Sequence, residues 1–251
     1  MFDLNIKGNS YDTNLILAKQ ASKYGWKHIN FAYNQNDYNN ALIFKNDVQK
    51  ELNGSIDIDY TLNIESNNPN EIRKITRKFR HKTSCISVLG GNLKVNRTCL
   101  ENVQIDVLSK PYFKRYDAGI NHILAKQAKD NNVAIELQFC DILKSYSSHR
   151  SKILSNFRDI IKLHNKYDFP LILSSGADSI FDIKTVHDFK SVFKQCGLSD
   201  VDIEKSFNVS ENIINFNKNR KNMIMAGVKV VKWWNLKFYR NLKGNIIIIW
   251  F

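Results

Sequence analysis

The chain has 251 residues, and its 37 lysines and arginines outnumber its 24 aspartates and glutamates to give a net charge of +13. Its length fits one α/β barrel or two small domains. We expect a single globular domain, because 43% of the residues are hydrophobic and only ten are glycine and three proline. The positive charge favours a polyanionic partner, with nucleic acid first, although a basic surface that serves only solubility explains the composition equally well.

The cysteines and the N-terminus indicate where the protein works. Four cysteines lie far apart without a CxxC pair: Cys85, Cys99, Cys140 and Cys196. This usage is typical of reduced, partly buried thiols in an intracellular protein. The N-terminal segment MFDLNIKGNS lacks the pattern of a secretory signal, and the longest apolar run, residues 246–251, is far shorter than the roughly 20 residues that span a bilayer. We expect a cytoplasmic protein without membrane contact.

Short apolar runs rich in β-formers alternate with longer segments of helical period. This alternation is typical of parallel strands covered by helices. The expected strands are residues 2–6, 28–32, 56–64, 85–89, 105–108, 133–139 and 171–173. The expected helices are residues 13–24, 38–52, 70–80, 119–131, 148–167, 184–196 and 200–217. Each helix is expected to connect two strands by a right-handed crossover.

Seven such units close into a barrel as readily as they form an open sheet, and the loops favour the barrel. Polar stretches follow three expected strands, at residues 90–92, 109–111 and 174–178. In a barrel, loops at these carboxyl ends hold the functional groups. We expect residues 1–231 to form a seven-stranded TIM-like β/α barrel.

A C-terminal extension is expected at residues 232–251, where the character of the sequence changes. Aromatic, aliphatic and basic side chains are mixed there without a clear period. A packed terminal element is favoured because exposed isoleucine-rich runs aggregate. A docking arm and a segment ordered only by partners stay open as alternatives.

The patterns of common catalytic centres are absent from the sequence. There is no HxH or HExxH pair for a metal-dependent hydrolase and no GxSxG elbow for a serine hydrolase. Gly90 and Gly91 are too few for a phosphate-binding loop, and a tight turn explains them. The histidines are isolated, at His28, His81, His122, His149, His164 and His187. Each is better explained as a surface or structural residue than as a metal ligand.

Carboxylates near strand ends are of the type that magnesium prefers. They are Asp3, Asp57, Asp59, Glu136, Asp141 and Asp178. Asp57 and Asp59 share a face of one strand, but they lie near its start, away from the expected functional end. Glu136 is expected to point into the barrel and to make a structural polar contact there, because a buried carboxylate needs hydrogen bonds.

One basic segment, RKITRKFRHK at residues 73–82, is expected to form part of a helix. Its apolar residues recur at helical spacing, which predicts one packed side. The cations expected on the other faces are Arg73, Lys74, Arg77, Lys78 and Arg80. Because Glu71 alone offsets them, phosphate binding is favoured over a simple solvated face.

Two further basic sets follow the expected strands. The first contains Lys94, Asn96, Arg97, Lys110, Lys114 and Arg115, and the second contains Lys144, His149, Arg150, Lys152 and Arg158. In a closed barrel these sets lie together at one rim, where Tyr112, Tyr116 and Tyr146 are available to contact bases or sugars. Such a surface suits folded RNA.

Several ordered motifs resemble one known family. They are FDLNI, GGNLKVNRTCLEN, IDVLSKPY, GINHILAKQAKDNNVAIEL, LKSYSSHRSKILSNFR, LILSSGADSIFDIK and AGVKVV. Together they strongly resemble ribonuclease P protein component 3, the archaeal counterpart of the thirty-kilodalton eukaryotic subunit. The resemblance implies a barrel related to the polymerase and histidinol phosphatase superfamily, without its metal chemistry. Where those enzymes have an HxH pair, this chain has Asp3-Leu4-Asn5.

The resemblance also implies partners. The family assembles with the ribonuclease P RNA, with component 2 as a heterotetramer, and with other protein subunits. That assembly removes the 5′ leader from precursor tRNA using magnesium bound by the RNA. The chain itself is expected to hold no catalytic residue, no metal and no cofactor, and to rigidify the RNA. The RNA-contact candidates carried over from the matching motifs are Lys94, Asn96, Arg97, Lys110, His122, Lys144, Arg150, Arg158 and Ser175.

Two other functions stay open at this point. A metal-dependent phosphoesterase on the same barrel predicts phosphodiester turnover by the purified chain, and loss of that turnover in Glu136→Gln. A protein-binding scaffold is suggested only by the apolar extension, and deletion of residues 232–251 with a test of association with component 2 checks it.

Overall fold

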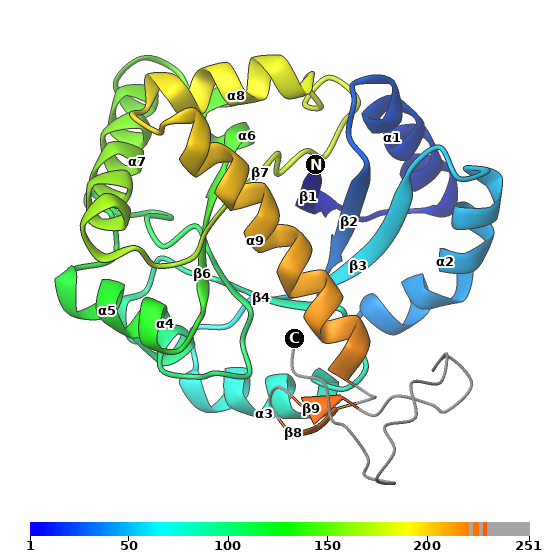
Figure 1. Cartoon of the computed structure of the whole chain (residues 1–251), viewed down its shortest axis with the longest axis horizontal. Coiled ribbons are helices and arrows are strands. Elements are labelled where there is room, and N and C mark those ends of the chain that lie inside the picture. The colour runs from blue at the N-terminus through cyan, green and yellow to red at the C-terminus, as the bar shows by residue number, and fades with distance from the viewer. Residues whose placement is uncertain (221–222, 226–227, 230–251) are drawn as a thin grey trace, which may run out of the picture.

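The computed structural model describes residues 1–220, 223–225 and 228–229. The strands of its main sheet are β1 (Phe2–Lys7), β2 (His28–Tyr33), β3 (Asp57–Ile64), β4 (Cys85–Leu89), β5 (Val107–Ser109), β6 (Ala134–Gln138) and β7 (Leu171–Ser174). The helices are α1 (Tyr11–Lys23), α2 (Tyr38–Glu51), α3 (Pro69–Phe79), α4 (Leu93–Leu100), α5 (His122–Asp130), α6 (Phe139–Leu143), α7 (Ser147–Tyr167), α8 (Val186–Gln195) and α9 (Asp200–Asn219). The helices surround the strands (Figure 1).

The seven strands form a nearly closed parallel barrel, as predicted. Each strand pairs in parallel with the next in the chain, from β1 to β7. Backbone hydrogen bonds also connect the first strand to the segment that follows the last strand. Lys7 N donates to Ala177 O at 2.7 Å, and Gly176 N donates to Asn5 O at 2.9 Å. These bonds lie at the carboxyl ends of the edge strands. The loops after the strands are therefore held around one mouth of the barrel.

The main core lies between the strands and the surrounding helices. Strand β2 is buried at every position, which is typical of a parallel strand covered on both faces. A second, smaller cluster fills the inside of the barrel and contains Leu4, Cys85, Val107, Ala134, Ile172 and Ile214. Alternation places polar residues two positions further along the same strands, as in Ser87, Ser109, Glu136 and Ser174. The barrel interior is thus apolar near the strand starts and polar toward the carboxyl ends.

Helix α9 closes the amino-terminal end of the barrel. It crosses in front of the strands in Figure 1 and packs against β1, β4 and β7. Its Ile214 belongs to the internal cluster, and its Asn217 Nδ2 donates to Ser84 O at 2.9 Å. Lys218 of the same helix lies 2.9 Å from the Asp59 carboxylate, which also pairs with Lys45. Asp59 is therefore an ion-pair partner at the closed end, which agrees with the expectation that it lies away from the functional end.

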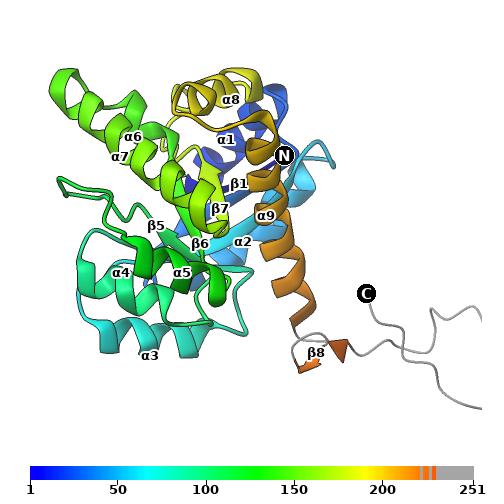
Figure 2. The ribbon, with the colours of Figure 1, turned by 60° about the vertical axis from the view of Figure 1, so that its left-hand side comes forward.

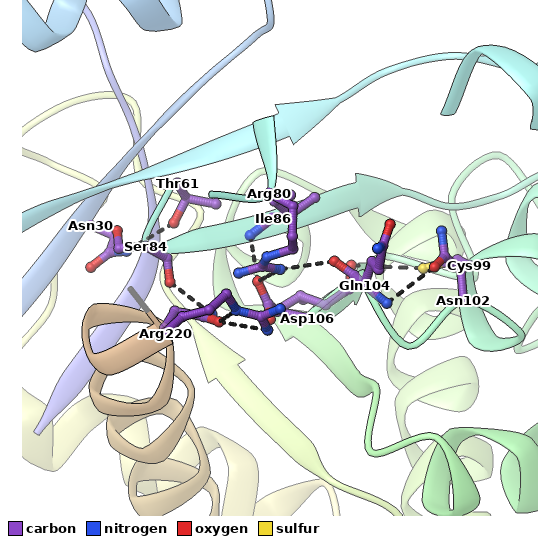
Figure 3. Close-up of polar contacts among 12 residues, drawn as sticks. Asn30, Thr61, Arg80, Ser84, Ile86, Cys99, Asn102, Gln104, Asp106 and Arg220 are labelled. Carbon is purple, nitrogen blue, oxygen red and sulfur yellow. Dashed lines mark hydrogen bonds and ion pairs between the residues drawn. The ribbon is translucent and has the colours of Figure 1, made fainter. Parts of the chain in front are cut away.

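Arg80 corrects one expectation from the sequence. We expected its side chain on an exposed face, but it is 1% exposed and donates to Asp106 Oδ2 at 2.7 Å and to Gln104 O at 2.8 Å. Figure 3 shows the guanidinium between these residues, with Arg220 nearby. The helical period explains the difference, since positions 72, 76 and 80 share one row of the helix and that row faces the core.

Two helices and one small sheet were not predicted. Residues 93–100, expected as a loop, form α4, and the expected strand 133–139 ends at Gln138, where α6 begins. The missed signal for α4 is Asn92, whose side chain accepts a hydrogen bond from Lys94 N at the start of the helix. Strands β8 (Met223–Met225) and β9 (Val228–Lys229) form a separate antiparallel pair inside the range expected to belong to the barrel. The expected extension, residues 232–251, lies outside the described residues.

The four cysteines are free and buried, as the sequence predicted. No helix in the described ranges combines the length and the apolar composition that a bilayer crossing requires.

Candidate functional site

A pocket opens at the mouth of the barrel formed by the carboxyl ends of β5, β6 and β7. Its volume is about 350 Å³. The loop after β5 forms one wall, and α6 with the first turns of α7 forms the other. The lining side chains are largely polar and basic, and they include Lys110, Tyr112, Phe113, Lys114, Arg115, Gln138, Asp141, Lys144, His149, Lys152, Asn156 and Asp178. We refer to this feature as the mouth pocket.

One buried amide holds the loops beside the mouth pocket. Asn96 on α4 accepts from Gly91 N at 3.0 Å and donates to Pro111 O at 3.0 Å and to Gly119 O at 2.8 Å. Gly119 has a φ of 70°, and a Cβ added there would lie 1.9 Å from Pro111 O. Only glycine fits this close approach. Asn96 therefore joins the loop after β4 to the loop after β5.

Several cations of the mouth pocket are neutralised by neighbouring carboxylates. Lys110 Nζ lies 3.2 Å from Asp141, which also accepts from the Tyr112 hydroxyl at 2.7 Å. Lys144 Nζ lies 2.6 Å from Asp178 and 2.9 Å from Asp182. Partial burial lowers the pKa of Lys144, but these two carboxylates outweigh burial and raise it above its ordinary value. Lys144 is therefore charged and forms ion pairs with two carboxylates of the same chain.

Two lysines of the mouth pocket have no such partner. In the described part of the chain no ion pair joins Lys114 or Lys152 to a carboxylate. Instead, Lys114 lies over the ring of Phe113 at 5.2 Å, and Lys152 lies over the ring of Tyr116 at 3.2 Å from its centroid. The Tyr116 side chain is 92% exposed. The arrangement places two positive charges without a carboxylate partner beside a largely exposed aromatic ring, one face of which Lys152 covers.

The structure brings together only some of the predicted RNA-contact residues. Lys110 and Lys144 line the mouth pocket. Arg150 is exposed beside it, with Nε donating to Ser145 O at 2.8 Å and its guanidinium over Tyr146. Arg158 is exposed two turns further along α7. Of the first basic set predicted from the sequence, only Lys110, Lys114 and Arg115 therefore lie at the mouth pocket together with members of the second set.

The other predicted contacts lie elsewhere. Lys94, Arg97 and His122 are exposed on α4 and α5, and Arg97 pairs with Glu101 at 2.7 Å. Asn96 is fully buried, and Ser175 is 2% exposed, with its hydroxyl accepting from Ala177 N. These two side chains face the interior because they hold loops in place. We leave them out of the candidate site.

The interior beneath the mouth pocket holds two carboxylates in hydrogen-bond networks. Glu136 accepts from Asn5 Nδ2 at 3.1 Å, from Gln138 Nε2 at 3.2 Å and from Ser174 Oγ at 2.6 Å. Asp3 accepts from Asn5 N at 3.1 Å and from Ser175 N at 3.2 Å. Glu136 is 1% exposed, so it makes the buried structural contact that the sequence predicted.

At the positions where the sequence resemblance places an HxH pair in metal-dependent enzymes, the interior has no histidine. The positions of the HxH pair are held by Asp3 and Asn5, whose side chains are used in the internal network. Among the described residues no three His, Cys, Asp or Glu side chains gather into a metal-binding group. Burial also raises the pKa of the Cys140 thiol beside the mouth pocket to about 12, so it is not an activated nucleophile.

Replacing Asp3 with asparagine is expected to change how stability depends on pH. Burial, only partly offset by hydrogen bonds, raises the pKa of Asp3 from 3.8 to about 6. Stability that is present below the unfolded-state pKa is therefore lost as the pH rises through the folded-state value, by about 3 kcal/mol. Asparagine does not ionise. The stability of Asp3→Asn relative to the wild type should thus rise by about 2 kcal/mol between pH 4 and pH 7.

Urea unfolding across this range measures the difference. Burial lowers the pKa of His28 to about 4, so its contribution has the opposite sign, but it is present in both proteins and cancels in the difference. The control is Asp12→Asn on the exposed first turn of α1, for which we expect a difference within about 0.5 kcal/mol. An equally flat difference for Asp3→Asn would contradict the burial of a charge at this site.

Sequence reasoning did not single out two residues that line the mouth pocket, Gln138 before α6 and Asn156 on α7. It noted Asp141 only as a carboxylate that follows a predicted strand. Its pairing with Lys110 crosses from one β/α unit to the next, which the sequence does not display.

Comparison with known proteins identifies relatives over nearly the whole chain. The family model described as RNase P subunit p30 matches residues 1–222. Ribonuclease P protein component 3 of Methanothermobacter thermautotrophicus is 37% identical over 92% of this chain and 95% of its own length. The same component of Methanococcus maripaludis strain C5 is 35% identical over 92% of this chain and 98% of its own.

Solved structures agree with these relatives. A chain of an archaeal ribonuclease P determined by cryo-electron microscopy with mature tRNA has a TM-score of 0.78 and 26% identity, covering 92% of this chain and 98% of that one. Histidinol phosphate phosphatase from Lactococcus lactis has a TM-score of 0.53 and 12% identity over 79% of this chain and 94% of its own, which shows a shared fold. The ordered motifs, the barrel and these matches together show that the chain belongs to the RNase P subunit p30 family, ribonuclease P protein component 3.

Proposed function

We propose that this chain is an RNA-binding subunit of ribonuclease P that stabilises the catalytic RNA and performs no chemistry itself. The observation that supports this role best is the mouth pocket, where Lys114 and Lys152 are uncompensated beside the exposed ring of Tyr116. Cations without internal partners bind phosphates without first breaking an ion pair. The Tyr116 ring offers a stacking surface to a base or ribose.

The wider rim adds to this surface. Lys110, Lys144 and Arg150 lie in or beside the mouth pocket, and their chain partners fix their positions. Such residues position an RNA backbone more than they add charge, because their carboxylate partners stay nearby. Lys94, Arg97, His122 and Arg158 extend the exposed basic surface over α4, α5 and α7.

Within the holoenzyme we propose the partners of the family: the ribonuclease P RNA, precursor tRNA, component 2 in a heterotetramer and the other protein subunits. The magnesium of the reaction is assigned to the RNA, because the interior of this barrel uses its carboxylates in internal hydrogen bonds. Cleavage of precursor tRNA reconstituted with and without this chain tests the role, and the chain is expected to lower the magnesium concentration that the RNA requires. A requirement for magnesium that is the same in both assemblies contradicts stabilisation of the RNA.

The double variant Lys114→Gln with Lys152→Gln is expected to weaken binding to the ribonuclease P RNA. Two lost phosphate contacts lower the slope of log affinity against log salt by roughly 1.5 to 2. Binding measured from low to high potassium chloride gives both quantities. The matched control is Lys162→Gln with Lys166→Gln, which removes two exposed charges from the far part of α7, where Lys166 likewise lies over Tyr167. If the salt slopes of the two variants agree, the mouth pocket is not the RNA site.

A further inference from the structure

Helix α3 presents a second, separate basic surface. Its core side contains Ile72, Ile75, Thr76 and Phe79, and all four are buried. The exposed cations of the helix and the turn that follows it are Arg73, Lys74, Arg77, Lys78 and Lys82, with His81 among them. We call these residues the α3 surface.

The cations of the α3 surface are not neutralised by the chain. In the described ranges none of its lysines and arginines forms an ion pair with a carboxylate. The acidic residue of this helix, Glu71, accepts instead from Ser66 Oγ at 2.6 Å. In the mouth pocket, by contrast, Lys110 and Lys144 each have carboxylate partners. In the described ranges the α3 surface therefore has five cations without a carboxylate partner, whereas the mouth pocket has two, Lys114 and Lys152.

The α3 surface lies away from the mouth pocket. None of its residues lines that pocket. In Figures 1 and 2, α4 and α5 lie between α3 and α7, and α3 forms the outermost helix on that side. Of these helices, α4, which bears the exposed Lys94 and Arg97, packs directly against α3. A ligand of the mouth pocket does not reach α3 without spanning this intervening pair of helices.

The geometry of the α3 surface indicates the class of partner. Arg73 and Arg77 form one row and Lys74 and Lys78 an adjacent row, and four residues of helix rise about 6 Å. These charges lie on the outer side of a helix, and none of them lines the mouth pocket or the pocket beside Tyr33 and Phe44. No large apolar side chain is exposed between residues 69 and 82, which disfavours insertion into a membrane and the apolar centre of a protein interface.

The same features separate double-helical from single-stranded RNA. Unpaired bases are recognised by stacking on exposed aromatic rings. The mouth pocket offers the large ring of Tyr116, whereas the α3 surface has no exposed Phe, Tyr or Trp and only the imidazole of His81. Double-helical RNA presents phosphates and hydroxyls in a fixed shape and is bound through them.

We propose that the α3 surface is a second RNA-binding site that contacts the phosphate backbone of a double-helical segment, while the mouth pocket binds a different part of the same RNA. This inference rests on the proposed function. It assigns this cluster of unpaired cations to a site that adds affinity and fixes orientation rather than reading sequence.

The test compares two variants of the full chain that each lose four charges. The α3 variant is Arg73→Gln, Lys74→Gln, Arg77→Gln and Lys78→Gln. The control is Lys19→Gln, Lys23→Gln, Lys27→Gln and Lys50→Gln, all exposed on or beside α1 and α2. The probes are the ribonuclease P RNA and a short RNA duplex, each bound over a range of potassium chloride concentrations. Circular dichroism first establishes that both variants are folded.

The α3 variant is expected to lower the salt slope for both probes by roughly 3, since each lost phosphate contact removes about 0.7 to 0.9. Backbone footprinting on the ribonuclease P RNA is expected to lose protections in a duplex segment that Lys114→Gln with Lys152→Gln leaves protected. The control is expected to keep the wild-type slope within about one contact.

Each outcome separates this inference from the proposed function. If the wild type and all variants fail to bind the ribonuclease P RNA, the proposed function fails. If the wild type binds, the mouth-pocket variant weakens binding and the α3 variant behaves as the control does, then only the α3 site is overturned. Equal losses in the α3 variant and the control also overturn it, because they show a general effect of net charge.

Discussion

Replacing Asn96 with alanine is expected to lower the free energy of unfolding by about 3 to 5 kcal/mol. The change leaves Gly91 N, Pro111 O and Gly119 O without their partner in the interior, and each unsatisfied group costs roughly 1 to 3 kcal/mol, part of which relaxation of the loops recovers. Because these loops form one wall of the mouth pocket, affinity for the ribonuclease P RNA should fall as well. Urea unfolding and RNA binding well below the melting temperature measure the two effects.

Two variants identify the cause of the Asn96 effect. Asn96→Asp keeps the size but replaces the amide donor, so that an oxygen faces Pro111 O and Gly119 O, and we expect a loss at least as large. Asn92→Ala removes the exposed side chain that caps the same helix, and about 1 kcal/mol is expected. Wild-type stability in Asn96→Ala would refute the role given to this amide.

Replacing Arg80 with alanine is expected to destabilise the fold by about 3 to 5 kcal/mol. Asp106 then keeps its bond from Ile86 N but loses the guanidinium, and a largely buried carboxylate is left without its counter-charge. The deleted side chain also leaves a cavity, because Arg80 is fully buried at the end of α3. Thermal and urea unfolding provide the measurement.

The exposed Arg77 provides the matched control for Arg80. It lies on the same helix, and Arg77→Ala is expected to change stability by no more than about 0.5 kcal/mol while weakening RNA binding. Because the Arg80 pair is buried, its loss should be nearly independent of salt, unlike the RNA effect of Arg77. A salt-dependent stability loss in Arg80→Ala would argue against a buried ion pair.

Much of the fold was predictable because strand and helix periods are local properties of the sequence. All seven strands of the barrel were expected close to their observed positions, since each is a short apolar run between helical segments. The short helices α4 and α6 were missed for the same reason. Eight residues after two glycines, or five directly after a strand, are too few to show a helical period.

The candidate site was predictable in outline only. Basic residues after the strands indicated one positive mouth, and the motifs indicated the family and its RNA. The sequence did not show which of these residues have buried side chains. Asn96 and Ser175 belong to matching motifs, yet their side chains hold loops inside the structure. Arg80 belongs to a basic segment of the sequence, but its side chain is buried because its row of the helix faces the core.

The sequence by itself determined the succession of strands and helices along the chain, the net charge and the family, all of which depend on the order and composition of its residues. Only the tertiary structure decided which of the described cations lack a carboxylate partner. Lys144 is paired with Asp178 from a distant loop, whereas Lys152 has no carboxylate beside it in the described chain. The physical reason is that an ion pair depends on the distance between two charges in the folded chain. That distance is set by which β/α units the barrel places side by side, and the sequence of one unit does not specify the side chains next to it.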